Sequence, residues 1–408
     1  MAKSWRLALF CSGLILLSQA FPLPSPVRDA ATGAWVSGFS LRLPPLYIFF
    51  APFCGLADRL TLLSYHQAVV LIVYLLLGFY GIWGFRRGTL AVLVLIAFLA
   101  WTILVPHPMA RLVAQDPDVL LIDFHSHTCV SHDGRKMFTP GRNMAWHREQ
   151  GYNAAFITDH NRVESAQQAK ALSRADWRRT GYRSLEGEEA SLFKTHLVIL
   201  GNHERIDNRP YDSDAKKIPL FIADMHQRKI PVIASIPEYW WYHWEGSSLG
   251  TVDDFIQWGI DGFEIINSAP KALDFPPAYR RHIVELCRAH NLPMTGISDN
   301  HGWGYATAAW NALHLPGWQA MDPDQLEAAV LSALRTRRFA AVQVLERFRY
   351  NPESVSGLLA APWVDAWLYW RSLQLSEALS WIAWIWLLYR LRLLDKSMKK
   401  SRIKASQR

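Results

Sequence analysis

Residues 119–134 read VLLIDFHSHTCVSHDG, a short apolar run followed at once by a cluster of polar residues. The run at 119–124 is typical of a buried β-strand, because it is brief, apolar and rich in branched side chains. Three of the chain's 15 histidines, His125, His127 and His132, follow it. Hydrogen bonding in a core explains one buried histidine, but it rarely explains three so close together. The stretch therefore predicts metal ligands at the end of a strand.

The alternation of a strand with a helix repeats through most of the chain. Strand-like runs are expected at 119–124, 153–158, 195–200, 231–236, 262–267, 293–298 and 338–344. Helix-like stretches are expected at 140–150, 163–175, 213–228, 252–258, 277–290 and 323–336. This repeated alternation predicts an α/β protein with a parallel sheet, either doubly wound or closed into a barrel.

Polar side chains follow three of these predicted strands. They are His125 and His127, Asp159 and His160, and Asp299 and His301. In an α/β barrel the carboxyl ends of the strands meet on one face, where active sites are built. We therefore expect these residues to lie together on one rim.

The motifs HSHT…SHDG, ITDHN, GEEAS…THLVILG and SDNHG occur in this order. Together they resemble those of the polymerase and histidinol phosphatase (PHP) superfamily, over roughly residues 119–345. The resemblance implies a distorted (β/α)7 barrel of the TIM-like, PHP type. It also implies two or three divalent metal ions, usually Zn, Mn or Fe, and a metal-dependent phosphoesterase activity.

Carried over position by position, the resemblance implies a set of eight metal ligands. They are His125, His127, His132, His160, Glu189, His196, Asp299 and His301. His132 stands where many members have an aspartate, and Glu188 competes with Glu189 for the bridging position. The family's further histidine is replaced by Ile236, and His243 is the candidate to substitute for it. A two-metal site, or a weakened third metal, is the expected result.

Histidine and carboxylate ligands suit borderline divalent metals, and two such ions can hold a phosphate and activate a water molecule. Asp133 and Asp159 are expected to support catalysis by orienting the histidine ligands. The candidate substrate-binding residues are Lys194, Arg135, Trp240, Trp241 and His243. The aromatic run 239–244 leaves three roles open: a stacking wall for a sugar or base, a membrane-interface segment, or a packed lid.

The basic residues lie at the ends of the chain and not in its body. The net charge is +8, yet residues 111–360 carry 27 Lys and Arg against 30 Asp and Glu. Such a body is a poor partner for a phosphate backbone, so no nucleic acid partner is expected. Basic ends are typical of segments that flank membrane spans on the cytoplasmic side.

Apolar segments near both termini predict transmembrane helices that flank the barrel. A signal or anchor segment is expected at about 7–21, and spans are expected at about 66–84, 89–106 and 374–393. Arg86 and Arg87 predict a cytoplasmic turn between the second and third segments. The expected domains are a membrane region at 1–108, the metal-binding barrel at 117–348, an amphipathic linker at 349–373, the C-terminal span, and a basic cytoplasmic tail at 394–408.

This topology predicts a multi-pass protein of a bacterial inner (cytoplasmic) membrane, with the barrel on the periplasmic, extracytoplasmic side. The expected substrate is a phosphorylated small molecule or a lipid-linked phosphoester. A hydrolase of a non-phosphoester bond is one alternative. A non-catalytic, metal-containing binding or regulatory membrane module is the other, and the number of intact ligand positions argues against it.

Overall fold

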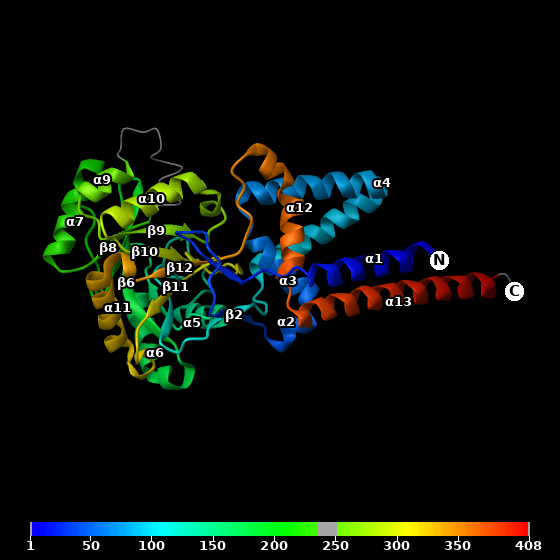
Figure 1. Cartoon of the computed structure of the whole chain (residues 1–408), viewed down its shortest axis with the longest axis horizontal. Coiled ribbons are helices and arrows are strands. Elements are labelled where there is room, and N and C mark those ends of the chain that lie inside the picture. The colour runs from blue at the N-terminus through cyan, green and yellow to red at the C-terminus, as the bar shows by residue number, and fades with distance from the viewer. Residues whose placement is uncertain (1, 236–250, 407–408) are drawn as a thin grey trace.

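The computed structural model describes residues 2–235 and 251–406, in which a curled sheet wrapped by helices lies beside a group of apolar helices (Figure 1). The sheet has ten strands. In spatial order they are β1 (Val27–Asp29), β12 (Gln343–Arg347), β11 (Ala309–His314), β4 (Val119–Asp123), β5 (Ala154–Ile157), β6 (Arg183–Leu192), β7 (Thr195–Leu200), β8 (Val232–Ala234), β9 (Gly262–Asn267) and β10 (Met294–Ile297).

The strand directions are mixed, whereas the sequence predicts a parallel sheet. β4, β5 and β6 run parallel to one another, as do β8, β9 and β10, but β7 is antiparallel to both β6 and β8. A tight hairpin causes this reversal, because Leu192 pairs with Thr195 and Lys194 between them has a φ of 53°. The observed fold is thus an α/β fold with a curled sheet, compatible with a TIM-like barrel.

The end strand β10 of the curled sheet approaches β11 and β12, near the other end of the sheet. Asn311 of β11 donates from Nδ2 to the carbonyls of Ile122 (2.9 Å) and Gly296 (2.6 Å), and its Oδ1 accepts from Gly296 N (2.8 Å). A Cβ on Gly296 would lie 2.7 Å from Val344 Cγ1, so only glycine permits this close approach. The buried asparagine therefore bridges the strands that the backbone ladder leaves unpaired.

Helices cover the outside of the sheet. They are α5 (Pro140–Gln150), α6 (Glu164–Thr180), α7 (Ile218–Gln227), α9 (Val252–Gln257), α10 (Pro277–Ala289) and α11 (Pro323–Arg337). Along β4, Leu120 and Ile122 belong to the main core and Leu121 packs in a second cluster on the other face. This alternation has the period of two that a strand imposes. It explains why a chain leaving β4 can present His125 and His127 to the same space.

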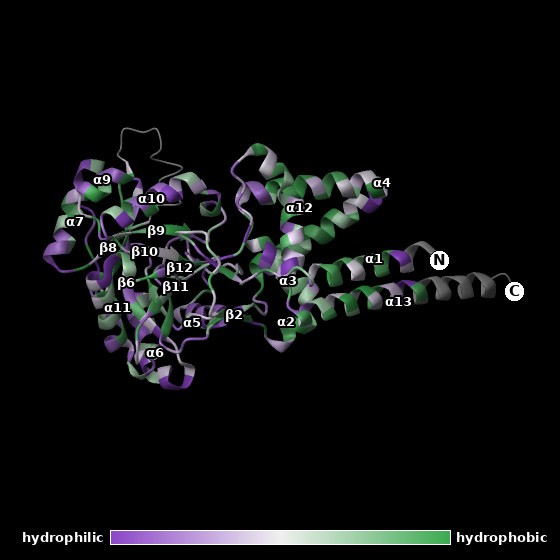
Figure 2. Cartoon of the chain, viewed as in Figure 1, coloured by the Kyte–Doolittle hydropathy of each residue, from purple (hydrophilic) through white to green (hydrophobic). Residues whose placement is uncertain are grey.

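The apolar helices near the N-terminus contain one candidate membrane span. Among the described residues, α4 (Tyr65–Leu104) is the one helix that is long and apolar enough to cross a membrane by length and composition. It includes the span expected at 66–84 and most of the span expected at 89–106, and it is broken at Gly84, where φ is 68° and ψ is 177°. Its ribbon in Figure 2 carries mostly the colours of hydrophobic residues.

The remaining helices of this part are α1 (Ala2–Ser18), α2 (Pro45–Phe49), α3 (Ala51–Thr61), α12 (Val355–Ser372) and α13 (Leu375–Ser406). α1 and α13 run side by side (Figure 1). α13 covers nearly all of the span expected at 374–393, but it is not among the candidate spans in the described residues. Its apolar stretch is rich in tryptophan, which prefers the membrane–water interface to the hydrocarbon centre.

Both ends of α4 contact the rim of the sheet. At its start, Tyr65 N donates to Pro270 O (3.1 Å), in the loop after β9. At its end, Ile103 O accepts from Gly304 N (2.9 Å), in the loop after β10. A Cβ on Gly304 would lie 2.5 Å from Thr102 O, so the two backbones meet directly. The apolar helices are therefore joined to the carboxyl-end face of the sheet, where the predicted site lies.

Candidate metal centre

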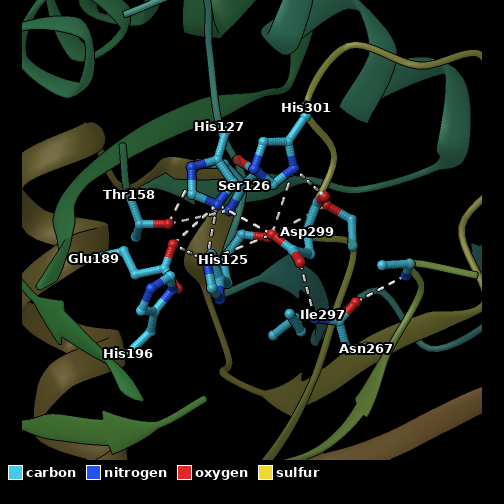
Figure 3. Close-up of polar contacts among 12 residues, drawn as sticks. His125, Ser126, His127, Thr158, Glu189, His196, Asn267, Ile297, Asp299 and His301 are labelled. Carbon is cyan, nitrogen blue, oxygen red and sulfur yellow. Dashed lines mark hydrogen bonds and ion pairs between the residues drawn. The ribbon is translucent and has the colours of Figure 1, made fainter. Parts of the chain in front are cut away.

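The predicted ligands converge on the carboxyl-end rim, as Figure 3 shows for the residues around Asp299. The ends of β4 and β10 are tied together, since Asp299 N donates to His125 O (3.0 Å) and His127 N donates to Asn300 O (3.1 Å). Asp299 has a φ of 49°, a strained conformation for a non-glycine residue that often marks a functional site. These bonds place two ligand segments, far apart in sequence, within one small space.

Glu189 lies at the middle of the cluster. Its Oε2 is 3.0 Å from His125 Nε2, 3.2 Å from His127 Nε2 and 3.1 Å from His160 Nδ1. Its Oε1 is 2.8 Å from His196 Nδ1. One buried carboxylate thus meets four histidine rings that come from three separate segments of the chain.

The strand geometry of β6 decides between Glu188 and Glu189. Successive side chains of a strand point to opposite faces, so only one of the two can face the cluster. Glu188 faces away, and its Oε2 accepts from Asn202 Nδ2 (2.9 Å) and Ile206 N (3.0 Å). Glu189 is the residue that reaches the histidines.

A second carboxylate, Asp133, lies at the outer side of the cluster. Its Oδ2 is 3.3 Å from His160 Nε2 and 3.1 Å from His301 Nε2. A Cβ on the next residue, Gly134, would lie 1.8 Å from Thr128 O, so the tight loop that presents Asp133 requires glycine. Asp133 was expected only to orient ligands, but it occupies a ligand-like position itself. His132 lies beside His160, with ring centroids 4.8 Å apart.

Four groups of described residues bring three or more potential ligand atoms within 4.8 Å of one another, and three of these groups adjoin in the rim. The three are His127, Asp133, His160 and His301; His125, His127 and Asp299; and His160, Glu189 and His196. His127 and His160 each belong to two groups. Imidazole nitrogens combined with carboxylate oxygens suit borderline divalent cations, so the donor set fits the expected metals.

The ligand positions implied for Ile236 and His243, and the substrate-binding roles expected for Trp240 and Trp241, lie outside the described residues. The strand before them, β8, ends at Ala234. The group of His160, Glu189 and His196 therefore offers three ligands among the described residues.

The carboxylates and histidines of the rim stabilise each other's charges. Burial opposes the charge on Glu189, but His125, His160 and His196 lower the pKa of its carboxyl well below the ordinary value. Burial also opposes the charge on His301, whereas Asp299 and Asp133 outweigh it and raise its pKa to about 9. The ionised carboxylates of this buried cluster form a field that suits a divalent cation, and metal binding would release the proton that His301 holds at neutral pH.

Asp159 supports the rim without reaching its centre. Its Oδ1 accepts from Thr128 N (2.6 Å), its Oδ2 accepts from Thr128 Oγ1 (2.6 Å), and Ser165 also donates to it. Its Oδ1 lies 3.9 Å from His127 Nδ1, to which Ser131 Oγ is closer at 3.3 Å. Asp159 therefore fixes the loop that carries His127, more than it holds the ring itself.

Glu264, in β9, is a buried acid that none of the sequence motifs includes. Its Oε1 is 2.8 Å from His125 Nδ1, and both side chains are 1% exposed. Burial raises the pKa of Glu264, and His125 partly offsets this effect. A carboxylate at Nδ1 sets the tautomer of His125 and turns Nε2 toward the ligand cluster. The signal was one acid within the otherwise apolar strand GFEIIN.

The candidate substrate-binding residues Arg135 and Lys194 take different positions. Arg135 follows the Asp133 loop, and its backbone N donates to His301 O (2.9 Å). Its guanidinium lies 5.0 Å from the centroid of the Trp303 ring. Lys194 occupies the hairpin between β6 and β7, with Nζ 5.6 Å from the Phe193 ring centroid.

The fourth group, Glu186, His203 and Glu327, lies away from the rim on the outer face of β6. The buried ammonium of Lys170 is 3.0 Å from Glu327 and 3.7 Å from Glu186. These carboxylates raise the pKa of Lys170 against the opposing effect of burial. A fixed cation therefore already balances this cluster.

No family model and no curated protein matches the chain. Among solved structures, a protein described as a metal-dependent phosphoesterase from Bifidobacterium adolescentis has 18% identity and a TM-score of 0.35, over 46% of this chain and 89% of its own. PsfC from Pseudomonas syringae has 16% identity and a TM-score of 0.39, over 63% of this chain and 99% of its own. An amidohydrolase from Chromobacterium violaceum, with bound sulfate and no metal, has 17% identity and a TM-score of 0.30, over 51% and 96%. Likenesses at this level carry no conclusion about activity.

Proposed function

We propose that the chain is a membrane-anchored, metal-dependent hydrolase that cleaves a phosphoester at the extracytoplasmic face. The observation that carries the proposal is the position of Glu189 Oε2, within 3.2 Å of ring nitrogens from His125, His127 and His160. A buried carboxylate shared by several histidines is typical of a site with more than one metal ion. The order of the PHP-like motifs supports the phosphoester as the bond that is cleaved.

Two or three divalent ions, of Zn, Mn or Fe, would be held by the three adjoining groups in the rim. Bound metals would supply Lewis acidity toward a phosphoryl oxygen and a lowered pKa for attacking water. Glu264 and Asp159 prepare the site before substrate binds, because Glu264 fixes the ring of His125 and Asp159 fixes the loop that carries His127. This preorganisation lowers the reorganisation needed during catalysis.

Asp133 and Arg135 are suited to meet the substrate. The side chain of Asp133 is 41% exposed, compared with 3% for Glu189, so it marks the open side of the cluster. Arg135, two residues later, carries a cation near that side. We therefore assign Asp133 both ligand and positioning roles, and Arg135 the role of neutralising the phosphate.

Membrane anchoring through α4 is part of the proposal. The break at Gly84 and the contacts of both helix ends with the sheet rim support a segment that enters and leaves the bilayer. Arg86 and Arg87 lie beside that break, where the positive-inside rule assigns the cytoplasm. A reporter fused after Arg87 would then report cytoplasm, and one fused after Val113 would report the opposite side.

The proposed activity is tested with the full chain in detergent, loaded with Zn, Mn or Fe and assayed on a panel of phosphomonoesters and phosphodiesters. The control is the double variant His125→Ala/His127→Ala. Turnover that disappears in the double variant is the expected result. Turnover that is equal in both proteins, or hydrolysis of amides in place of phosphoesters, would exclude the proposed reaction.

A further inference from the structure

A groove of about 450 Å³ lies between the loop that follows β4 and the C-terminal end of α4. Its apolar walls are formed by Leu104, Met137, Phe138, Trp146 and Trp303. This volume falls within the range of sites that bind small molecules or parts of larger ones. The groove is distinct from the ligand cluster, none of whose side chains lines it.

The groove lies next to the metal centre along the chain. Arg135 and Gly302, which line it, closely follow Asp133 and His301 in the chain. Arg135 Nη1 donates to Gly302 O (3.1 Å) and reaches Leu104 O (3.5 Å). One arginine thus connects the rim loop to the end of α4, and its guanidinium lines the groove beside the Trp303 ring.

The groove is continuous with the apolar surface of the candidate membrane span. Leu104 and Val105, at the end of α4, are 48% and 43% exposed, and Met137 across the groove is 62% exposed. Adjacent exposed apolar side chains of this kind mark an interaction surface. Because Gly304 is bonded to Ile103, the metal centre is held at the level where α4 would leave the bilayer.

The charges around the groove complement a phosphate at a membrane surface. Arg135 and Arg142 line it, and Lys136 is exposed beside it. Glu149 is the one acid among the groove-lining residues. Basic side chains at the mouth of an apolar groove suit an amphiphile with an anionic head and a hydrocarbon tail.

We propose that this groove binds the hydrocarbon part of a membrane lipid whose phosphoester head reaches the metal centre. The inference rests on the proposed function and adds the substrate class, a lipid drawn from the bilayer and not a soluble phosphoester. The apolar walls desolvate the first part of the chain, while Arg135 positions the phosphate. The hydrocarbon contacts lower KM for the lipid, and they leave KM unchanged for a substrate that lacks a tail.

The test uses the full chain, metal-loaded and reconstituted in phosphatidylcholine vesicles, with two matched substrate pairs. Dioleoyl phosphatidic acid is compared with glycerophosphate, and phosphatidylglycerol is compared with glycerophosphoglycerol. Met137→Gln and Leu104→Gln each place a polar group in the groove, and Leu220→Gln, at a 60% exposed position on α7, is the matched control. The ratio of kcat/KM for lipid to kcat/KM for its tail-free partner is measured for each protein.

We expect the parent to favour the lipid by at least tenfold, and each groove variant to lower that ratio by about fivefold, because one apolar side chain no longer packs on the tail. Leu220→Gln leaves the ratio unchanged. Equal use of both members of a pair, or a ratio insensitive to Met137 and Leu104, overturns the groove assignment and leaves the hydrolase intact. Absence of turnover on all four substrates overturns the proposed function and the groove assignment with it.

Discussion

Glu264 offers a sharp test of how the ligand cluster is held, because it touches one ligand and lies outside the three ligand groups of the rim. Glu264→Gln keeps the shape of the side chain and removes its charge. The substitution weakens a buried, charge-assisted hydrogen bond of 2.8 Å to His125 Nδ1. Such bonds contribute about 1.5–3 kcal/mol, and removing a carboxylate behind a metal-bound histidine lowers affinity about 10- to 100-fold.

The assay is competition between the full chain and a chromophoric chelator for Zn or Mn. We expect the weakest-bound ion of Glu264→Gln to dissociate about 10- to 100-fold more readily than that of the parent. Glu285→Gln, a change on the solvent side of α10, is the matched control and leaves the affinity unchanged. If Glu264→Gln binds metal as tightly as the parent, His125 is not positioned through Nδ1 and the reasoning fails.

Three further predictions test other parts of the structure. Gly134→Ala forces a Cβ to within 1.8 Å of Thr128 O, so we expect this variant to bind less metal. Gly141→Ala, with open space around the added Cβ, is the control and keeps the parent's metal content. Equal metal content in the two variants contradicts a loop that requires glycine. Lys170→Met leaves buried carboxylates without their cation and destabilises the fold by about 3–5 kcal/mol, seen as a lower thermal midpoint. Burial raises the pKa of the Cys287 thiol to about 12, so this thiol stays protonated at mildly alkaline pH and iodoacetamide labels it only after unfolding. Peptide mapping distinguishes Cys287 from the partly exposed Cys11 and Cys129, and labelling at Cys287 in the native chain contradicts this.

Periodicity predicts much of the sheet because buried strands such as 119–124 and 262–267 are short and apolar. It misses β6, since RSLEGEEASL contains three carboxylates and does not look like a buried strand. Those acids are tolerated because Glu186 meets Lys170, Glu188 meets backbone and amide donors, and Glu189 meets histidines. β11 was also missed, because its place in the sheet depends on pairing with β4 and β12 from distant parts of the chain.

The bounds of the last predicted strand and of the N-terminal membrane region also differ from the structure, because they depend on contacts between distant parts of the chain. The strand expected at 338–344 begins later, at Gln343, because residues 338–340 form a short 3₁₀ helix. β1, at Val27–Asp29, pairs with β12 although it lies within the expected membrane region at 1–108. Pairing partners this far apart in sequence leave no local signal, so the three-dimensional fold is needed to find them.

The candidate site follows more closely from the sequence, because its motifs stand at the ends of recognisable strands. His125, His127, His160 and the Asp299 segment meet as expected from that placement, whereas Glu189, implied only by the resemblance, joins them from within β6. The sequence does not show that Asp133 takes a ligand-like position next to His132, because this depends on the tight approach of Gly134 to Thr128. Glu264 is hard to assign from the sequence for a different reason: its local signal is one acid in an apolar strand, and its role arises from a single contact with His125 across the sheet.

We propose that the rim of the curled sheet binds several divalent metals through shared histidine and carboxylate ligands. The decisive measurement is elemental analysis of the purified full chain after exchange into metal-free buffer. We predict more than one divalent ion per chain in the parent and a clear decrease in Glu189→Ala, because the Glu189 carboxylate contacts four of the ligand histidines. Less than one ion per chain, or the same content in parent and variant, would contradict it.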